Sequence, residues 1–399
     1  MEHYDVCVMG LGYIGLPTAS LLATKGMRVR GVDVRPEVVD RIRHGRYDVK
    51  EPDLDVLVRS AVQSGNLEPG LEAAPADVFM IAVPTPFREG HAPDLSYVEA
   101  ATASLIPFLA EGNLVILEST SPVGTTEEVE RQITAARPEL KGRILVAHSP
   151  ERVLPGQILQ ELVGNDRVVG GIDAASTKAV AAFYRRFVRG EVMETTARTA
   201  EMTKLVENSY RDVNIAFANE LSMICGELGI SVRELIRFAN QHPRVDILQP
   251  GPGVGGHCLA VDPWFIVWSD PKNARMIRTA REVNVTKSEW VFDRVVEKAE
   301  RFKKPVIAVL GIAYKPDVDD TRESPSLHIA GQLRERYGAD VLVVEPNLTE
   351  HPWFPLFDAE EAVSRADVVV ALVSHREFKH LDRELLSARV VLDICGAFR

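Results

Sequence analysis

The first 33 residues constrain the fold of this chain more than any other segment. Residues 5–9 form a short apolar run, and Gly10, Gly12 and Gly15 follow it directly. An alanine- and leucine-rich stretch from about residue 17 to 26 predicts a helix, and residues 28–32 predict a second strand. Glycines allow the tight turn and the close helix packing that this order requires. The pattern predicts an α/β fold with a parallel sheet.

The turn after the first strand also predicts a binding site for a dinucleotide. Backbone N–H groups and the positive dipole end of a helix N-terminus suit a pyrophosphate. Asp33 ends the second strand, where a carboxylate accepts from a ribose 2′-hydroxyl and repels a 2′-phosphate. The predicted cofactor is therefore NAD. The residues expected to contact it here are Gly10, Gly12, Tyr13, Ile14, Gly15 and Asp33.

Three later apolar runs, residues 78–83, 114–118 and 144–147, each lead directly into a polar loop. In an open parallel sheet the loops at the carboxyl ends of the strands form the ligand crevice. The alternative for each polar residue is turn chemistry or helix capping. The candidates in these loops are one carboxylate and three threonines, and the threonines are assigned to the cofactor: Glu151, Thr85, Thr120 and Thr126.

Residues 199–229 predict one long helix without proline. Lys204, Asn208 and Arg211 are spaced four and three apart, so they lie on one side of it. Such a stripe can serve a ligand or form a solvated face. The far end carries apolar residues such as Leu221 and Ile224. A helix of this kind crosses between domains or pairs with a second subunit.

Residues 250–264 contain a thiol and a carboxylate in a segment rich in glycine and proline. Cys258 is followed four residues later by Asp262, and the composition predicts a shaped loop with no regular helix or strand. A ligand can approach a thiol on glycine-rich backbone closely, and a nearby titratable group can assist it. The alternative is a buried, inert cysteine.

Composition narrows the class of protein. At 399 residues the chain is too long for a single core. Its net charge of −11 makes a nucleic-acid partner unexpected, and no apolar run approaches a membrane span. Four scattered cysteines without a C-x-x-C pair argue against a bound metal and against disulfides, and no basic signal segment opens the chain. We expect a cytoplasmic enzyme.

The last hundred residues repeat the alternation of strands and helices, without a G-x-G-x-x-G turn. The predicted fold class is α/β, with two Rossmann-like doubly wound domains joined by a long central helix. The expected domains are a Rossmann domain over residues 1–195, a central helical domain with the cysteine loop over 196–295, and an α/β domain over 296–399.

Several ordered motifs resemble the UDP-glucose/GDP-mannose dehydrogenase family along the whole chain. They lie at residues 12–17, 118–124, 150–156, 200–208, 242–245, 253–258 and 322–325. UDP-glucose dehydrogenases typically have Ser before the cysteine and Lys before the aspartate. Here His257 and Val261 stand in those positions. The resemblance is therefore closest to members that act on UDP-N-acetyl-D-mannosamine, with UDP-N-acetylglucosamine or UDP-glucose as alternative substrates.

The resemblance implies a four-electron oxidation of the sugar C6 alcohol to a carboxylate, with Cys258 as the covalent nucleophile. Lys204 matches the lysine that stabilises an oxyanion, and Asn208 its hydrogen-bonding partner. Asp262 matches the aspartate that orients water, and Glu151 the general-base carboxylate. Lys204 and Asn208 also meet the sugar nucleotide, and Arg322 reaches NAD. The other residues expected to bind the UDP-sugar are Arg152, Val153, Arg211, His242, Arg244, Gly255 and Lys315.

Two other functional hypotheses remain for a chain with these features. The β-hydroxyacid dehydrogenases also join a Rossmann domain to a long helix, but they lack the cysteine loop and the second α/β domain. A non-catalytic nucleotide sensor could use the same scaffold, although intact Cys258, Lys204 and Asp262 argue against it. The resemblance further implies a homodimer built on the long helix, with Arg244 as a candidate contact between subunits.

Overall fold

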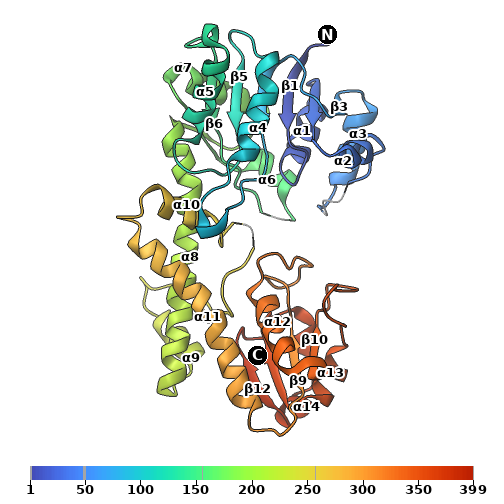
Figure 1. Cartoon of the computed structure of the whole chain (residues 1–399), viewed down its shortest axis with the longest axis vertical. Coiled ribbons are helices and arrows are strands. Elements are labelled where there is room, and N and C mark those ends of the chain that lie inside the picture. Colours follow the sequence, from blue (N-terminus) through green and yellow to red (C-terminus); the bar gives the residue numbers. More distant parts are fainter. Residues whose placement is uncertain (1, 48–50, 155, 257, 399) are drawn as a thin grey trace. The chain divides into compact units, whose positions relative to one another are not determined.

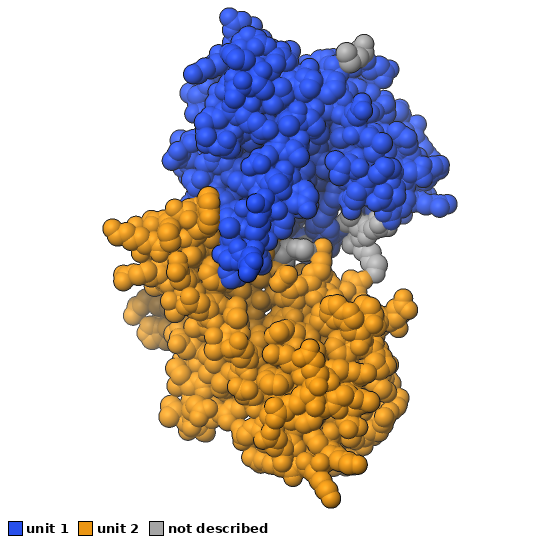
Figure 2. Space-filling model, viewed as in Figure 1, with its two compact units in different colours: residues 1–207 blue, residues 208–399 orange. Residues whose placement is uncertain are grey.

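A computed structural model of the chain describes residues 2–47, 51–154, 156–256 and 258–398 (Figure 1). The chain divides into two compact units, residues 1–207 and residues 208–399, coloured blue and orange in Figure 2. One long helix, α8 (Ala197–Leu228), begins in the first unit and ends in the second, as the sequence predicted. No helix in the described ranges is both long and apolar enough to cross a membrane.

Unit 1 is built on an eight-stranded sheet with strand order β3-β2-β1-β4-β5-β6-β7-β8. Its strands are β1 (Tyr4–Met9), β2 (Val29–Val32), β3 (Leu67–Gly70), β4 (Ala76–Ile81), β5 (Leu114–Leu117), β6 (Leu145–His148), β7 (Arg167–Gly171) and β8 (Val192–Thr196). Its helices before α8 are α1 (Gly15–Thr24), α2 (Pro36–Arg43), α3 (Leu54–Gln63), α4 (Ser96–Leu105), α5 (Thr125–Ala136), α6 (Ile158–Gly164) and α7 (Ala174–Tyr184).

Side chains alternate across this sheet, which explains why helices cover both faces. On β1, Val6 and Val8 enter a core with residues of α1, α3, α6 and α7. Cys7 and Met9 enter the opposite core, with residues of α4 and α5. Strands buried on both faces read as continuous apolar runs, as they do here. The doubly wound prediction is confirmed.

One strand pairing departs from the expected parallel order. β7 pairs antiparallel with β6, through Ala147 opposite Gly171 and His148 opposite Gly170. The other pairings in the sheet, from β3 through β6 and between β7 and β8, are parallel. Periodicity predicts that a segment is a strand but not its direction. The carboxyl ends of β1 to β6 therefore share one edge, and β7 begins at that edge instead of ending there.

Unit 2 is built on a second, smaller sheet with strand order β10-β9-β11-β12, parallel throughout. Its strands are β9 (Ile307–Leu310), β10 (Val341–Val344), β11 (Val368–Ala371) and β12 (Val390–Asp393). Its helices after α8 are α9 (Val232–Ala239), α10 (Asp262–Ser269), α11 (Arg275–Ala299), α12 (Pro325–Tyr337), α13 (Ala359–Arg365) and α14 (Arg383–Ser387). One core joins the sheet to α11 and α12, and the other joins it to α13 and α14.

Candidate active site

The turn between β1 and α1 fits a dinucleotide. Gly10 has a φ of +94°, which favours glycine, and a Cβ there would lie 2.5 Å from the carbonyl oxygen of Ala82. A Cβ on Gly15 would lie 1.9 Å from the carbonyl oxygen of Gly10, so the helix packs against the turn without a side chain. At Gly12 a Cβ would meet nothing within 4 Å. Gly12 therefore leaves open backbone for a phosphate group at the N-terminus of α1.

Asp33 follows β2 and is nearly buried, with 6% of its surface exposed. Its carboxylate accepts from the Leu11 N–H at 3.2 Å and from the Arg35 N–H at 3.0 Å, and Arg35 Nε donates to it at 3.1 Å. Burial raises the pKa of this carboxyl, but these hydrogen bonds outweigh burial and lower the pKa overall. Asp33 is therefore a carboxylate beside the dinucleotide turn.

The predicted threonines lie at the carboxyl edge of the sheet but differ in exposure. Thr85 and Thr120 are half-buried, and the Thr85 hydroxyl donates to the Thr120 carbonyl at 2.5 Å. Thr126 is fully buried, and its hydroxyl donates to Glu201 of α8 at 2.6 Å. Glu201 also accepts from the N–H groups of Gly124 and Thr126, so it caps α5. The helix-capping alternative therefore describes the Thr126 contact in this structure.

Glu151 and Arg152 follow β6, and both side chains have ionic partners. Glu151 accepts from the Arg152 N–H at 2.7 Å and from Arg167 at 2.8 Å. Arg152 also forms an ion pair with Glu207 of α8 at 2.8 Å. Val153 packs against the core of unit 1. Lys204 is half-buried on α8, in the part of the helix that belongs to unit 1.

Cys258 is exposed in unit 2, whereas Cys7 and Cys225 are buried and Cys395 is half-buried. Burial raises the pKa of Cys7 to about 11 and that of Cys395 to about 12, so both stay thiols. The prediction of a presented thiol at residue 258 therefore agrees with its exposure. The inert alternative required a buried side chain.

The expected loop over residues 250–264 ends earlier than predicted. α10 begins at Asp262, so Asp262, Pro263 and Trp264 are helical. The prediction failed because proline is tolerated in the first turn of a helix, where backbone N–H groups make no hydrogen bond within the helix. The Asp262 N–H donates to the Cys258 carbonyl at 2.9 Å, which joins the cysteine to the start of the helix.

Asp262 is nearly buried, and Asn208 Nδ2 donates to its Oδ2 at 2.5 Å. The resemblance assigns Asn208 as the partner of Lys204, and here its side-chain amide contacts Asp262 instead. This bond fixes the carboxylate on the same short segment that carries Cys258.

The glycines before Cys258 pack against the segment that follows β9. A Cβ on Gly255 would lie 2.4 Å from the Glu323 carbonyl oxygen, and one on Gly256 would lie 3.0 Å from the Tyr314 ring. Burial and the nearby charges of Asp320 and Cys258 raise the pKa of Tyr314. Tyr314 therefore lies beside the thiol, a role that the sequence did not reveal.

Sequence reasoning also missed a buried polar network between α8 and α11 that holds the cysteine loop. Arg281 forms an ion pair with Asp212 at 2.6 Å, and Asn284 donates to the same carboxylate at 2.8 Å. Asn219 donates to Asn284 at 2.9 Å and accepts from the Gly251 N–H at 2.9 Å. Burial raises the pKa of Asp212, and Arg281 opposes this. No local sequence pattern joins these residues, because the two helices that carry them are far apart in the chain.

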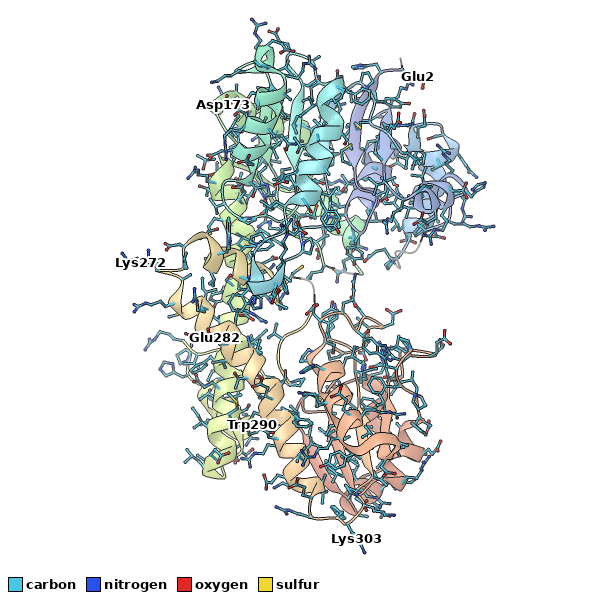
Figure 3. All side chains as sticks on the ribbon, in the orientation of Figure 1. Glu2, Asp173, Lys272, Glu282, Trp290 and Lys303 are labelled. Carbon is cyan, nitrogen blue, oxygen red and sulfur yellow. The ribbon has the colours of Figure 1, made fainter. Side chains whose placement is uncertain are left out.

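Next to this network, Lys287 of α11 is 2% exposed. Its Nζ donates to the Ser222 hydroxyl at 2.8 Å and lies 3.9 Å from the ring centroid of Trp290, which Figure 3 labels. Burial, reinforced by the positive charge of Arg294, lowers the pKa of Lys287 to about 7. The charged form of Lys287 is therefore disfavoured at this buried position.

The other residues predicted to bind the substrate, and Arg322, which was predicted to bind NAD, lie in unit 2. Lys315 is half-buried, and its Nζ lies 5.6 Å from the Tyr314 ring centroid. Arg322 forms an ion pair with Asp320 at 2.6 Å, and its carbonyl accepts from the Gly256 N–H at 3.3 Å. Arg322 therefore contacts the cysteine loop, to which Gly255 belongs, and Lys315 lies beside Tyr314, which packs against Gly256 of that loop. Three further predicted residues are exposed on α8 and after α9: Arg211, His242 and Arg244. His257 lies outside the described residues.

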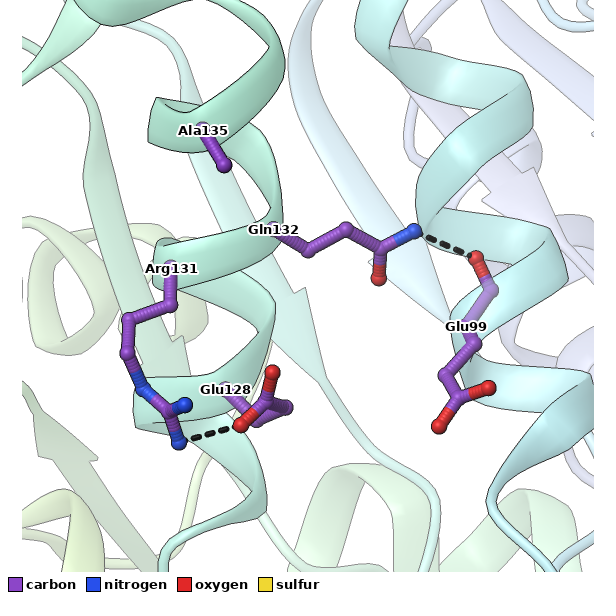
Figure 4. Close-up of a pocket in the computed structure, with 5 residues that line it drawn as sticks. All are labelled: Glu99, Glu128, Arg131, Gln132 and Ala135. Atoms are coloured by element: carbon purple, nitrogen blue, oxygen red, sulfur yellow. Dashed lines mark hydrogen bonds and ion pairs between the residues drawn. The ribbon is translucent and has the colours of Figure 1, made fainter.

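A pocket of about 410 Å³ opens elsewhere, between the outer surfaces of α4 and α5 (Figure 4). Gln132 donates across it to the Glu99 carbonyl at 2.9 Å, and Arg131 pairs with Glu128. None of the five residues that line it is a predicted site residue. The predicted catalytic residues lie elsewhere, on α8, in the cysteine loop and at the carboxyl edge of the first sheet.

Comparison with known protein families accounts for both units. Residues 4–188 match the NAD binding domain of the UDP-glucose/GDP-mannose dehydrogenase family, residues 198–286 its central domain, and residues 308–399 its UDP binding domain. The chain belongs to this family. Its cofactor is NAD, and the protein is an oxidoreductase that acts on nucleotide sugars.

Individual members of the family are similar over the whole chain. An NDP-N-acetyl-D-galactosaminuronic acid dehydrogenase of Ralstonia nicotianae is 54% identical, with 99% of this chain and 96% of that protein covered. A UDP-N-acetyl-D-mannosamine dehydrogenase of Yersinia pestis is 49% identical over the full length of both. The solved UDP-N-acetyl-mannosamine dehydrogenase of Staphylococcus aureus is 42% identical, with a TM-score of 0.87 over 98% of this chain and 95% of that one.

Proposed function

We propose that the protein oxidises C6 of UDP-N-acetyl-D-mannosamine to the carboxylate, with two hydride transfers and a covalent intermediate on Cys258. The observation that carries this proposal is the exposed thiol of Cys258 after a run of glycines, with the Asp262 carboxylate, which Asn208 holds, four residues later. A simple alcohol dehydrogenase needs no such thiol.

In this mechanism NAD supplies the hydride acceptor when it is bound. The first oxidation converts the primary alcohol to an aldehyde, and the Cys258 thiolate adds to the aldehyde carbon to form a thiohemiacetal. Loss of a second hydride leaves a thioester, and one water cleaves it to the carboxylate and the free thiol. The covalent bond retains the aldehyde between the two oxidations.

Four polar residues serve these steps. Lys204 is the cation that stabilises the oxyanion formed when thiolate or water adds to the carbonyl. Asp262 orients the attacking water, and Asn208 holds that carboxylate through the 2.5 Å hydrogen bond. Glu151 accepts a proton near the C6 group. The remaining predicted residues, with Lys315 and Arg322 beside the cysteine loop, bind the nucleotide sugar and NAD.

Two variants test the covalent step. Cys258→Ala should abolish acid formation while NAD binding persists, because the residues of the dinucleotide turn lie in unit 1. Cys258→Ser should accumulate an acyl-ester, since an alkoxide leaves less readily than a thiolate, and intact-protein mass spectrometry would detect the added uronyl group. Full acid production by Cys258→Ala would refute the proposal.

A second candidate substrate is a nucleotide derivative of N-acetylgalactosamine, because the relative from Ralstonia nicotianae at 54% identity is named an NDP-N-acetyl-D-galactosaminuronic acid dehydrogenase. Initial rates of NADH formation should be compared for the UDP derivatives of N-acetylmannosamine, N-acetylgalactosamine, N-acetylglucosamine and glucose. We expect kcat/KM for UDP-N-acetylmannosamine to exceed that for UDP-glucose at least about tenfold, the worth of roughly one hydrogen bond to the acetamido group. Preference for another sugar would reassign the substrate and leave the mechanism in place.

We also propose that the active unit is a homodimer built on α8 and that the enzyme works in the cytoplasm, where a reducing environment keeps free thiols reduced. Tyr210, Phe217 and Ile224 repeat every seven residues on α8, so they form one stripe. Their exposed fractions are 70%, 51% and 48%. Phe238 of α9 is 59% exposed as well. A second copy of the helix would cover this stripe, and Arg244 remains the candidate contact between subunits.

A further inference from the structure

A buried charged cluster surrounds Glu151 at the carboxyl edge of the first sheet. Arg167 at the start of β7 and Glu118 at the end of β5 are 5% and 3% exposed, and Tyr184 at the end of α7 is fully buried. Arg167 donates to Glu151 at 2.8 Å, and its guanidinium lies 4.8 Å from the Tyr184 ring centroid. The Tyr184 hydroxyl donates to Glu118 at 2.6 Å.

The charges in this cluster do not balance. Among the described residues of this cluster, two carboxyl groups, Glu118 and Glu151, share one cation, Arg167. Burial raises the pKa of Tyr184 well above its usual range, so the phenol stays neutral. β6 contributes His148, which is fully buried, and burial lowers its pKa to about 3, so it adds no second positive charge. One guanidinium neutralises one carboxylate, and the other is left to carry a proton or an uncompensated charge.

The hydrogen bonds decide which carboxyl takes the proton. Glu151 has both oxygens engaged, one by the Arg152 N–H at 2.7 Å and one by Arg167. Glu118 has the Tyr184 hydroxyl on one oxygen, and among the described residues its other oxygen is buried without a partner. Burial raises the pKa of Glu118 to about 7, although Arg167 opposes this. Glu118 is therefore the group of this pair that gains or loses a proton near neutral pH.

We propose that Arg167 is the positioning residue of Glu151 and that the charge of Glu118 acts on Glu151 through the shared guanidinium. Arg167 holds the Glu151 carboxyl group in one orientation. When Glu118 loses its proton, a second negative charge enters the cluster, and this charge favours the transfer of a proton into the cluster. This inference rests on the proposed role of Glu151 in proton transfer.

Three variants of the full-length enzyme test the inference, each with the preferred UDP-sugar and saturating NAD. Arg167→Met should lower kcat at least about tenfold and leave the KM for NAD within about twofold, because the effect acts on a reacting carboxylate and not on cofactor binding. Arg167→Lys keeps the charge and should recover much of the loss. Glu118→Gln keeps an acceptor for Tyr184 and should remove the rise of kcat through about pH 7. Glu139→Gln, at an exposed ion pair with Arg137, is the matched control and should leave the profile unchanged.

One readout does not depend on activity. The infrared difference spectrum between slightly acidic and slightly alkaline protein should show loss of a protonated carboxyl band, and Glu118→Gln should abolish it. The inference is overturned if the band persists in Glu118→Gln, or if the pH profile of that variant superimposes on the wild type. A kcat of Arg167→Lys no higher than that of Arg167→Met would also overturn it. Failure of the proposed function would appear elsewhere, as acid formation by Cys258→Ala.

Discussion

Arg281→Met should destabilise the protein strongly, because it breaks the buried ion pair beneath the cysteine loop. Arg281 is 4% exposed and Asp212 is fully buried, with 2.6 Å between them. The loss of one partner from a buried pair costs about 3–5 kcal/mol, since the other charge remains without compensation. For a unit of this size each kcal/mol lowers the Tm by roughly 2–4 °C, so we expect a drop of about 6–20 °C.

The pH dependence of this loss identifies its cause. Burial already raises the pKa of Asp212, and removal of Arg281 lets it rise further. A carboxyl with a raised folded-state pKa binds its proton more tightly in the folded protein, so protonation stabilises the fold. The deficit of Arg281→Met should therefore shrink as the pH falls from about 7 toward about 4. Differential scanning calorimetry at several pH values measures this.

Two further variants serve as controls for Arg281→Met. Arg336→Met removes an exposed ion pair with Glu300, at 2.7 Å, and should cost less than about 1 kcal/mol. Asp212→Asn combined with Arg281→Met should recover part of the lost stability, because no buried charge remains. A Tm for Arg281→Met equal to that of Arg336→Met, or a deficit that does not change with pH, would contradict the account of the network.

Three other predictions address the cofactor, the buried lysine and the dimer. Asp33→Ser should weaken NAD binding and reduce the preference for NAD over NADP, as measured by fluorescence titration. Equal use of NAD and NADP by the wild type would contradict the predicted contact of Asp33 with the ribose 2′-hydroxyl. Lys287→Met should raise the Tm at pH 7, because the pKa of Lys287 is lowered to about 7 in the folded protein and its charged form therefore destabilises the fold. The gain should fade toward pH 10, where the lysine of the unfolded chain also loses its proton. A gain independent of pH would contradict this. Phe217→Glu should convert the dimer to a monomer in analytical ultracentrifugation, whereas Tyr97→Glu, an aromatic residue with the same exposed fraction of 51%, should not. A wild-type enzyme that is active as a monomer would end the dimer proposal.

Features set by local sequence were predictable in this chain. The three glycines at positions 10, 12 and 15 predicted the turn. A side chain at Gly10 or Gly15 would clash with a neighbouring carbonyl oxygen, whereas Gly12 leaves the backbone open. The apolar runs predicted the strands, and the absence of proline over residues 199–229 predicted one long helix, which runs from one unit into the next. The glycines before Cys258 predicted a loop that presents the thiol, and the Cys258 side chain is exposed.

Features set by contacts between distant segments were not predictable. Glu118 and Tyr184 are 66 positions apart, and Arg281 and Asp212 are 69 apart, so no local pattern joins either pair. Thr126 was assigned to the cofactor from its position after a strand, but the contact with Glu201 depends on how α8 packs on α5. Strand direction at β7 likewise depends on the tertiary path of the chain.

The most direct test of the central claim is the ratio of NADH formed to sugar acid formed when a limiting amount of UDP-N-acetylmannosamine is consumed. Absorbance gives the NADH and chromatography gives the acid. The covalent mechanism on Cys258 predicts a ratio of two, with no aldehyde released, because the thiohemiacetal holds the first product until the second hydride leaves. A ratio of one, or free aldehyde accumulating in solution, would contradict the mechanism.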